Sequence, residues 1–375
     1  MKISLLQENL EKAVLLTSRI VNAKTQLPIL TNLLFEAKKE GLFISATNLE
    51  TSIVVGVPAK TEEVGKITLP AKTLQELVIS LPKEKVVLET EKERVKIVCH
   101  PTKVKVNGME AAEFPGIPDV DKSVKPWKLK SEDFIKACSQ VVFAASQDEA
   151  RPALTGVRLS GEKEGWELVA TDGYRLSKKT IVGKVEAGRL MIIPARTLNE
   201  IIRMIGEEEE ILIYPEKKQQ QIIFTFANIR LVSRLIDADF PPFAKVIPTS
   251  WETEISLDKE QFSRALKTAS IFARSSANII KLKVDADPKT GQKVNVSANA
   301  PSVGENESEI EAKVKGEAVE IAFNYRFVQE FLAVTQTDQI AIKLNGGVAP
   351  AIFEAVGDKS FLHVIMPVRV QKPEG

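Results

Sequence analysis

Apolar residues recur at helical spacing in three separate stretches of the chain. Each stretch places four apolar or small side chains at positions i, i+3, i+4 and i+7, which brings them onto one face of a helix. The three stripes are Leu10, Ala13, Val14 and Thr17, then Phe134, Ala137, Cys138 and Val141, then Phe262, Ala265, Leu266 and Ala269. One template met three times predicts an amphipathic helix in each of three similar segments, with Ser131 and Asp258 as N-caps of the later two.

Apolar strands follow each predicted helix, starting near Leu30, Leu154 and Ile279, and the first two strands are joined by charged turns that contain Gly41, Gly165 or Gly291. In the middle segment, the next strand runs into the polar turn ATDGYRL at 170–176. The sequence ATNLE at 46–50 places Thr47 124 positions before Thr171, and SAN at 297–299 keeps part of the pattern. A motif repeated in this way predicts three copies of one domain.

A second helix is predicted at 69–77 and at 193–201, which match almost position for position, and at 323–331 in the third copy. Alternating strands close each copy. The predicted fold class is α+β, with three tandem copies of a domain that packs two helices on one side of an antiparallel sheet. The predicted domains are 1–121, 128–249 and 252–375, with linkers around Trp127 and Trp251.

The composition is that of a soluble globular protein, with 44% apolar and 27% charged residues among 375. No apolar run reaches the length of a membrane helix, and the first residues lack the apolar core of a signal peptide. Cys99 and Cys138 lie in different copies and in apolar surroundings, so we expect no disulfide and a reducing cytoplasm. The net charge of +1 argues neither for nor against nucleic acid.

The chain carries no motif typical of an enzyme. It has no Cys/His cluster with metal spacing, no glycine-rich phosphate loop and no Gly-x-Ser-x-Gly elbow. We expect Asp172 and Asn48 to close turns on their own backbone, and His100 and His363 to be partly buried strand residues. No catalytic residue, metal or cofactor is predicted.

Cations recur at equivalent helical positions. In the first helices the residue two places after the start of the stripe is Lys12, Lys136 or Arg264, and the second helices align Lys72, Arg196 and Arg326. Arg19, Lys24, Arg203 and Lys267 add to these helices. Two interpretations remain open: an ordinary solvated helix face, or helices that face one polyanion, whose phosphates need only well-placed Lys and Arg.

Charge is also sorted between the ends of the chain. Lys96, Lys103 and Lys105 lie on late strands of the first copy, and Glu305, Glu307, Glu309 and Glu311 follow the SAN motif of the third. A basic first domain and an acidic third domain could meet head to tail and close a ring. Ordinary protection of sheet edges by charge is the alternative.

Together these motifs closely resemble the bacterial sliding clamp family, the beta subunits of replicative DNA polymerase III. The residues that carry the resemblance are LPILTN at 27–32, ATNLE at 46–50, RPALTGV at 151–157, ATDGYRL at 170–176, DFP at 239–241 and MPVR at 366–369. The resemblance covers essentially the whole chain. It implies three clamp domains, a head-to-tail homodimeric ring lined by helices with sheet outside, and passage of duplex DNA without sequence-specific contacts.

The resemblance also implies a non-catalytic processivity factor of the cytoplasm, associated with the nucleoid during replication. Its implied partners are the clamp loader, the polymerase alpha subunit, other polymerases, ligase and mismatch-repair proteins, bound through linear peptides of the Gln-Leu-x-Leu-Phe type. No membrane partner is implied. The second hypothesis is a peptide-binding scaffold that has kept the fold but no longer binds DNA.

Three sets of candidate residues result. The DNA-binding set is Lys12, Arg19, Lys24, Lys72, Lys136, Gln147, Arg196, Arg203, Arg264, Lys267 and Arg326. The peptide pocket implied by the resemblance is Leu154, Thr171, Gly173, Tyr174, Arg175, Leu176, Pro241, Lys245, Val246, Val364, Met366, Pro367, Val368 and Arg369. The dimer interface is Lys96, Lys103, Val104, Lys105, Val106, Glu305, Glu307 and Glu309. Within the pocket, we expect Arg175 and Arg369 to bond a peptide's Gln or carbonyls. The first copy has Leu49 and Glu50 in place of Gly173 and Tyr174, so no second pocket is expected there.

Overall fold

The computed structural model describes residues 1–22, 25–162, 165–183, 190–206, 210–216, 220–287 and 292–369. One order of elements, a strand, a helix, a set of strands, a second helix and three closing strands, occurs three times. The first copy is β1 (Lys2–Leu6), α1 (Gln7–Ser18), β2 (Asn32–Lys38), β3 (Gly41–Thr47), β4 (Thr51–Val57), β5 (Lys60–Glu63), β6 (Gly65–Pro70), α2 (Ala71–Ser80), β7 (Lys85–Glu91), β8 (Arg94–Cys99) and β9 (Thr102–Asn107).

The later copies repeat this order with one strand fewer. The second copy is β10 (Trp127–Lys130), α3 (Ser131–Val142), β11 (Gly156–Glu162), β12 (Gly165–Thr171), β13 (Arg175–Val182), β14 (Leu190–Pro194), α4 (Ala195–Met204), β15 (Glu210–Glu216), β16 (Gln221–Phe226) and β17 (Ile229–Arg234). The third copy is β18 (Thr253–Asp258), α5 (Lys259–Ala273), β19 (Ile279–Asp285), β20 (Lys293–Ala300), β21 (Gly304–Lys315), β22 (Val319–Asn324), α6 (Tyr325–Val334), β23 (Gln339–Leu344), β24 (Ala351–Ala355) and β25 (Phe361–Ile365).

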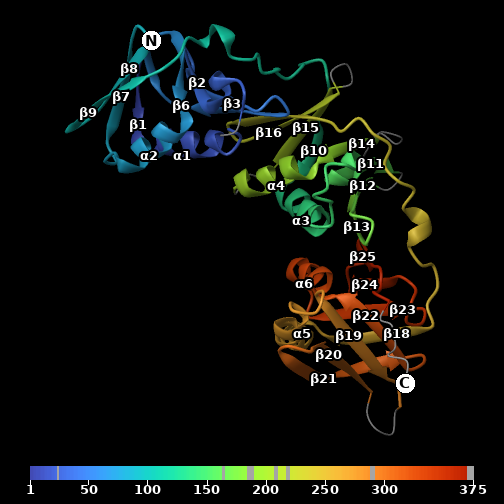
Figure 1. The fold of residues 1–375 in the computed structure, drawn as a ribbon. Coiled ribbons are helices and arrows are strands. Elements are labelled where there is room, and N and C mark those ends of the chain that lie inside the picture. The colour runs from blue at the N-terminus through green and yellow to red at the C-terminus, as the bar shows by residue number, and fades with distance from the viewer. Residues whose placement is uncertain are drawn as a thin grey trace. The chain divides into compact units, whose positions relative to one another are not determined.

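The chain forms two compact units whose limits do not follow the repeats. One unit, Met1–Phe134 with Arg196–Leu235, holds a five-stranded sheet (β5-β1-β7-β8-β9) and an eight-stranded sheet (β10-β15-β16-β17-β4-β3-β2-β6). The other, Ile135–Ala195 with Ile236–Gly375, holds a twelve-stranded sheet (β14-β11-β12-β13-β25-β24-β23-β18-β21-β20-β19-β22) (Figure 1). Each unit therefore contains strands from two copies.

Consecutive copies are joined by strand pairing in one register. At the first junction β17 pairs antiparallel with β4, and Ile229, the first residue of its strand, lies opposite Val55, the fifth residue of β4. At the second junction β25 pairs antiparallel with β13, and its first residue Phe361 lies opposite Lys179, the fifth residue of β13. Each pairing is continued by one backbone bond past the strand: Arg234 N donates to Glu50 O at 2.8 Å, and Met366 N donates to Tyr174 O at 2.9 Å. The two junctions are therefore built alike.

The predicted helix stripes face the core. All four residues of each stripe are buried, and the helix pairs α1/α2 and α5/α6 are in contact and pack on strands of their own copy (Figure 1). Asp258 caps α5 as predicted, accepting a bond from Gln261 N at 2.8 Å. The prediction for Ser131 is wrong, because this residue is the first of α3 and its buried hydroxyl has no partner among the described residues.

The strands of the first two copies begin later than predicted. Leu30 and Leu154 lie in short 3₁₀ turns, η1 (Pro28–Thr31) and η3 (Pro152–Thr155), which precede β2 and β11. Proline fixes the backbone angle at the start of each turn. Thr31 and Thr155 close the turns by donating their hydroxyls to Pro28 O at 2.7 Å and to Pro152 O at 2.8 Å.

The polar turns of the first two copies have the same hydrogen bonds. Asp172 Oδ1 accepts from Tyr174 N at 2.8 Å and from Arg175 N at 3.0 Å. Asn48 Oδ1 accepts from Glu50 N at 3.1 Å and from Thr51 N at 2.7 Å. The middle residue has positive φ in both turns, 93° at Gly173 and 73° at Leu49. The expectation that Asp172 and Asn48 close turns on their own backbone is confirmed. In the third copy Asn299 stays within β20, so this turn is not repeated there.

The hairpin glycines Gly41 and Gly165 offer a test of the fold, while Gly291 lies outside the described residues. Both have positive φ, 143° and 149°, but a Cβ at Gly165 would lie 2.0 Å from Ile181 O, and one at Gly41 would lie 2.8 Å from Val57 O. We expect Gly165→Ala to lower the free energy of unfolding by about 3 kcal/mol and Gly41→Ala by roughly half as much, because both Cβ atoms would meet a backbone oxygen but the overlap at Gly165 is much deeper. Urea unfolding of the two variants measures this, and equal losses would contradict it.

Candidate functional site

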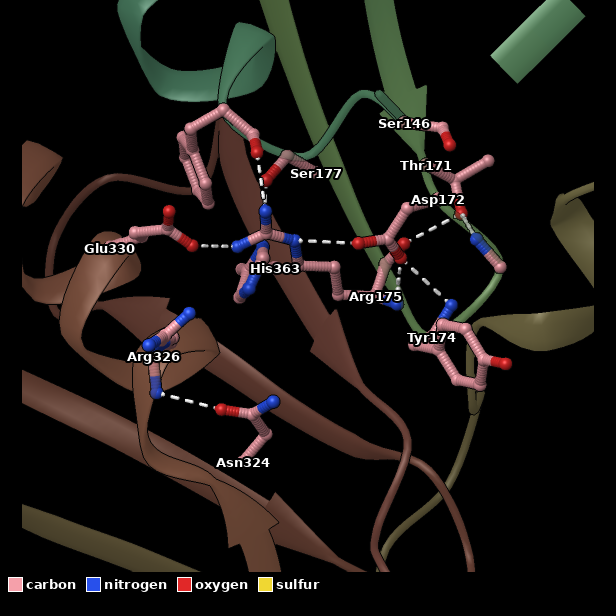
Figure 2. A network of polar contacts seen from close by, with 12 residues as sticks. Ser146, Thr171, Asp172, Tyr174, Arg175, Ser177, Asn324, Arg326, Glu330 and His363 are labelled. Atoms are coloured by element: carbon pink, nitrogen blue, oxygen red, sulfur yellow. Dashed lines mark hydrogen bonds and ion pairs between the residues drawn. The ribbon is translucent and has the colours of Figure 1, made fainter. Parts of the chain in front are cut away.

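The pocket of the second copy is built around the turn of Asp172. Besides its two backbone bonds, this carboxylate accepts from Arg175 Nε through Oδ2 at 3.1 Å (Figure 2). Thr171 Oγ1 donates to Arg175 O at 2.6 Å and accepts from Gly173 N at 3.0 Å. Five short bonds thus fix the path of the chain through Gly173 and Tyr174, because the turn's amides and carbonyls are satisfied locally.

A cavity of about 280 Å³ opens beside this turn, with walls from the second and third copies. It is mainly apolar and has a few polar groups, which suits a short peptide. The lining residues are Arg151, Leu154, Thr171, Gly173, Arg175, Leu176, Pro241, Pro242, Phe243, Val246, Val364 and Met366. Tyr174, Val246 and Met366 are exposed large side chains at this place, with exposed fractions of 63%, 40% and 37%.

Nine residues of the predicted pocket line the cavity. Tyr174, Lys245, Pro367, Val368 and Arg369 do not line it, although the backbone of Val368 is held by a bond from its N to Ala322 O at 2.8 Å. The sequence reasoning missed Arg151, Pro242 and Phe243. Two of them could have been suspected from the sequence, because Arg151 is the first residue of the RPALTGV motif and Phe243 lies just after the DFP motif. Neither motif, however, indicates which side chains line the cavity.

The guanidinium of Arg175 is used within the protein. It is 8% exposed, and its remaining nitrogens donate to Glu330 Oε2 on α6 and, at 2.6 Å, to Phe143 O just after α3 (Figure 2). The cation also lies 4.5 Å from the ring centre of Phe327 and 5.4 Å from that of Phe143. Each nitrogen of the guanidinium therefore has one acceptor within the protein, and the expectation that Arg175 also bonds a peptide stays a prediction.

His363 lies behind the pocket, on β25. It is fully buried, its Nδ1 is 2.7 Å from Ser177 Oγ, and its ring stacks on Phe331 with 5.6 Å between centroids. Burial and the nearby charge of Arg175 lower the pKa of His363 to about 3. The prediction for the other histidine is wrong, since His100 lies in an exposed turn between β8 and β9.

The predicted DNA-binding cations lie on helices or next to helix ends, except Lys24, which is outside the described residues. Lys12, Lys72, Arg264, Lys267 and Arg326 are exposed on α1, α2, α5 and α6, and Gln147 is exposed after α3. Several others are paired within the protein. Arg19 Nε bonds Glu200 at 2.6 Å, Arg203 bonds the same carboxylate at 3.2 Å, Arg196 bonds Glu50, Arg264 lies 3.6 Å from Glu260, and Lys136 lies 4.0 Å from Asp358. Exposed pairs of this kind are worth about 0–1 kcal/mol, so they do not withhold these cations from a polyanion.

The predicted interface residues lie on β9 and β21, which have open edges, except Lys96, which lies on β8 between β7 and β9. Among the described strands, β9 pairs only with β8, and the first eight residues of β21 pair only with β20. Lys103, Lys105, Glu305, Glu307 and Glu309 are exposed, Lys96 and Val104 are half-buried, and Val106 is buried in its own sheet. Some of these charges have partners: Lys105 lies 2.7 Å from Glu91, Lys96 lies 3.8 Å from Glu89, and Glu309 lies 2.7 Å from Lys293.

Other chemistry is limited among the described residues. Cys99 and Cys138 are free and buried, and burial raises the pKa of both thiols. No group of three or more His, Cys, Asp or Glu side chains in the described part of the chain could hold a metal ion. Of the described helices, none has the length and apolar character to cross a bilayer.

Comparison with known proteins identifies the family. Domain families of the DNA polymerase III beta subunit match in succession: the N-terminal domain at 1–118, the central domain at 128–242 and the C-terminal domain at 244–369. A beta sliding clamp of Synechococcus elongatus is 30% identical over an alignment that covers 99% of this chain and 100% of that protein. The chain belongs to the beta sliding clamp family. It is a non-catalytic sliding clamp subunit of DNA polymerase III, made of three clamp domains.

Solved clamp structures have the same fold. The DNA polymerase sliding clamp of Bacillus subtilis is 26% identical with a TM-score of 0.93, covering 99% of this chain and 100% of that one. A sliding clamp of Pseudomonas aeruginosa bound to griselimycin is 24% identical with a TM-score of 0.91, at the same coverage, and supports the clamp fold alone. The domain limits 1–121, 128–249 and 252–375 stay a prediction.

The buried histidine predicts how stability depends on pH. The pKa of His363 in the folded protein, about 3, lies below its ordinary value of 6.5, so the unfolded chain binds the proton first as pH falls. The contribution of neutral His363 to the free energy of unfolding is complete above about pH 6.5. It is lost as the pH falls toward 3, at about 1.4 kcal/mol per pH unit.

The expected result is a steeper loss of unfolding free energy between pH 6 and pH 4 in the wild type than in His363→Asn, whose amide can still bond Ser177 but does not titrate. Urea titrations at each pH measure both slopes. Parallel slopes would show that His363 does not control this loss.

Proposed function

We propose that two copies of this clamp assemble head to tail into a ring that encircles duplex DNA, and that the pocket beside Asp172 tethers partner proteins by short peptides. The observation that carries the ring is the common register of the two internal junctions, together with the two open edges that a third such junction would use. We infer a third junction between β9 of one subunit and β21 of another.

The internal junctions specify the register of this pairing. In both, the first residue of a copy's last strand lies opposite the fifth residue of the strand it meets. The corresponding residues at the open edges are Thr102, the first residue of β9, and Ser308, the fifth residue of β21. An antiparallel pairing then sets Lys103 opposite Glu307 and Lys105 opposite Glu305.

Charge supports this register. Residues directly opposite one another in an antiparallel pair have their side chains on the same face and within contact distance. Lys103 and Lys105 alternate with the less exposed Val104, and Glu305 and Glu307 alternate with Asn306. Each of the two cations would therefore lie opposite one of the two carboxylates. A shift by one residue would place cations opposite Asn306 and Ser308, and the charge pairs would not form.

The exposed helical cations support DNA as the occupant of the ring. They recur at equivalent positions of α1, α2, α5 and α6. A helix face that is exposed only to solvent would not need a cation at the same position in each copy. Contacts from Lys and Arg to phosphates position a duplex without reading its sequence, as sliding requires. These cations favour a DNA clamp over a scaffold that binds peptides alone.

The apolar cavity supports the second half of the proposal. Peptides with Gln and large apolar side chains, of the Gln-Leu-x-Leu-Phe type, fit a groove lined by Leu154, Leu176 and Val364 with Met366 at its exposed edge. Methionine adapts to varied apolar side chains, so one pocket can serve several partners. We propose as partners the clamp loader, the polymerase alpha subunit, other polymerases, ligase and mismatch-repair proteins, in the cytoplasm and, during replication, at the nucleoid.

Reversal of the helical charges tests the DNA-binding face. We expect Lys12, Lys72, Arg264 and Arg326 replaced together by Glu to weaken DNA binding and to lower the slope of log affinity against log salt by about one for each phosphate that is no longer neutralised. The matched control replaces Lys39, Lys66, Lys283 and Lys313, which are also exposed but do not lie on helices. Equal losses of affinity in the two variants would reject the helical face.

A second experiment separates the ring from the scaffold. After loading by a clamp loader, a ring stays bound to nicked circular DNA but not to linear DNA.

Charge exchange tests the ring junction. We expect Lys103→Glu with Lys105→Glu to shift the dimer toward monomer in sedimentation, because like charges would then lie opposite one another. Adding Glu305→Lys and Glu307→Lys should restore the dimer. Reversing Lys281 and Lys283, exposed on the interior strand β19, should leave it intact. If the variant with all four substitutions stays monomeric, this register is wrong.

A further inference from the structure

The carboxylate of Glu330 lies outside the peptide cavity but is linked to its wall by one side chain. We propose that Glu330 on α6 is a positioning residue for peptide binding: it holds the guanidinium of Arg175, and Arg175 holds the Asp172 turn in the form that leaves the pocket open. This inference rests on the proposed peptide-binding function of the pocket.

The link has two steps, both visible in Figure 2. Glu330 Oε2 accepts from Arg175 Nη1, and Arg175 Nε donates to Asp172 Oδ2 at 3.1 Å. The bond from Nη2 to Phe143 O at 2.6 Å and the ring of Phe327 at 4.5 Å complete the surroundings of the guanidinium. Because a guanidinium is planar and rigid, contacts at all of its nitrogens leave it a single orientation.

The second step acts on the cavity wall itself. Asp172 uses Oδ2 for Arg175 and Oδ1 for the amides of Tyr174 and Arg175, so a rotation of the carboxylate would weaken all three bonds together. Between these bonds lies Gly173, which lines the cavity with a φ of 93° that few other residues adopt. The shape of the pocket at Gly173 therefore depends on the orientation of Asp172, and through Arg175 on Glu330.

Comparison of the copies shows that this link is particular to the junction with the pocket. Glu76, Glu200 and Glu330 are each the sixth residue of the second helix of their copy. In the first copy Thr51 stands at the position of Arg175, and Asn48 stands at that of Asp172. There the carboxylate of Glu200 bonds Arg19 at 2.6 Å, at the end of α1. The same helical glutamate thus serves two different contacts, and the one that reaches a turn occurs where the cavity lies.

A plain structural role makes a different prediction. Glu330 is 45% exposed, and as a mere partner of a buried cation it would contribute to the stability of the junction without a specific effect on the pocket. A positioning role predicts that affinity for peptide falls more than stability does, and that the turn itself becomes less protected.

The test measures binding of a fluorescein-labelled Gln-Leu-Ser-Leu-Phe peptide to the full chain by anisotropy. We expect Glu330→Ala to weaken binding by about tenfold, the loss that corresponds to one charge-assisted hydrogen bond. The control is Gln329→Ala, the exposed neighbour on α6, which should bind like the wild type. Thermal melting of each variant is measured alongside, and amide hydrogen exchange at Tyr174 and Arg175 should accelerate in Glu330→Ala alone.

A double-mutant cycle completes the test. If Glu330 acts through Arg175, Glu330→Ala should add almost nothing to the affinity already lost in Arg175→Lys, which keeps the charge but not the planar fork. Affinity of Glu330→Ala within twofold of the wild type, unchanged exchange in the turn, or additive losses would overturn the positioning role. Failure of the wild type to bind the peptide would instead overturn the proposed function of the pocket.

Discussion

The structure depends on antiparallel pairing between the edge strands of successive copies. β17 continues the sheet of the first copy through β4, and β25 continues that of the second through β13, in one register. An exposed edge presents unpaired backbone groups that can pair with another chain and lead to aggregation. Covering the edge with a further strand prevents this. A chain built on this rule is left with two complementary edges at its ends, which a second copy can cover. The proposed ring would therefore use the same kind of pairing that already joins the domains within one chain.

The repeated turn shows how one local structure can serve different purposes. Thr47 and Asn48 form the same bonds as Thr171 and Asp172, yet only the second turn borders the cavity. The differences lie in the residues that the turn carries. Leu49 occupies the left-handed conformation at a cost that Gly173 avoids, and Thr51 replaces the arginine that reaches α6. The repeated turn has therefore kept its backbone hydrogen bonds, while different side chains at one junction line a cavity.

The helical charges are suited to weak contact. Arg19, Arg196 and Arg203 are exposed but paired with Glu200 or Glu50, whereas Lys12 and Lys72 are exposed on α1 and α2 of the same unit. Surface pairs are easily exchanged for other anions because each contributes little. Phosphates that compete with such pairs would be held without fixed positions. This is the electrostatic behaviour expected of a protein that moves along a polyanion.

The sequence by itself determined the features that lie within a few residues of one another. The helix stripes, the cap at Asp258, the turn bonds of Asp172 and the threefold repeat all follow from local spacing and side-chain chemistry. The tertiary structure decided what depends on distant residues. Two of the acceptors that hold the Arg175 guanidinium belong to Glu330 and Phe143, and nothing near position 175 in the sequence reveals them. Phe243 and Arg151 enter the cavity, and the two junctions share a register, because strands and loops far apart in sequence meet there. Local periodicity encodes which face of an element is buried, whereas the partner that buries it is chosen only when the sheets assemble.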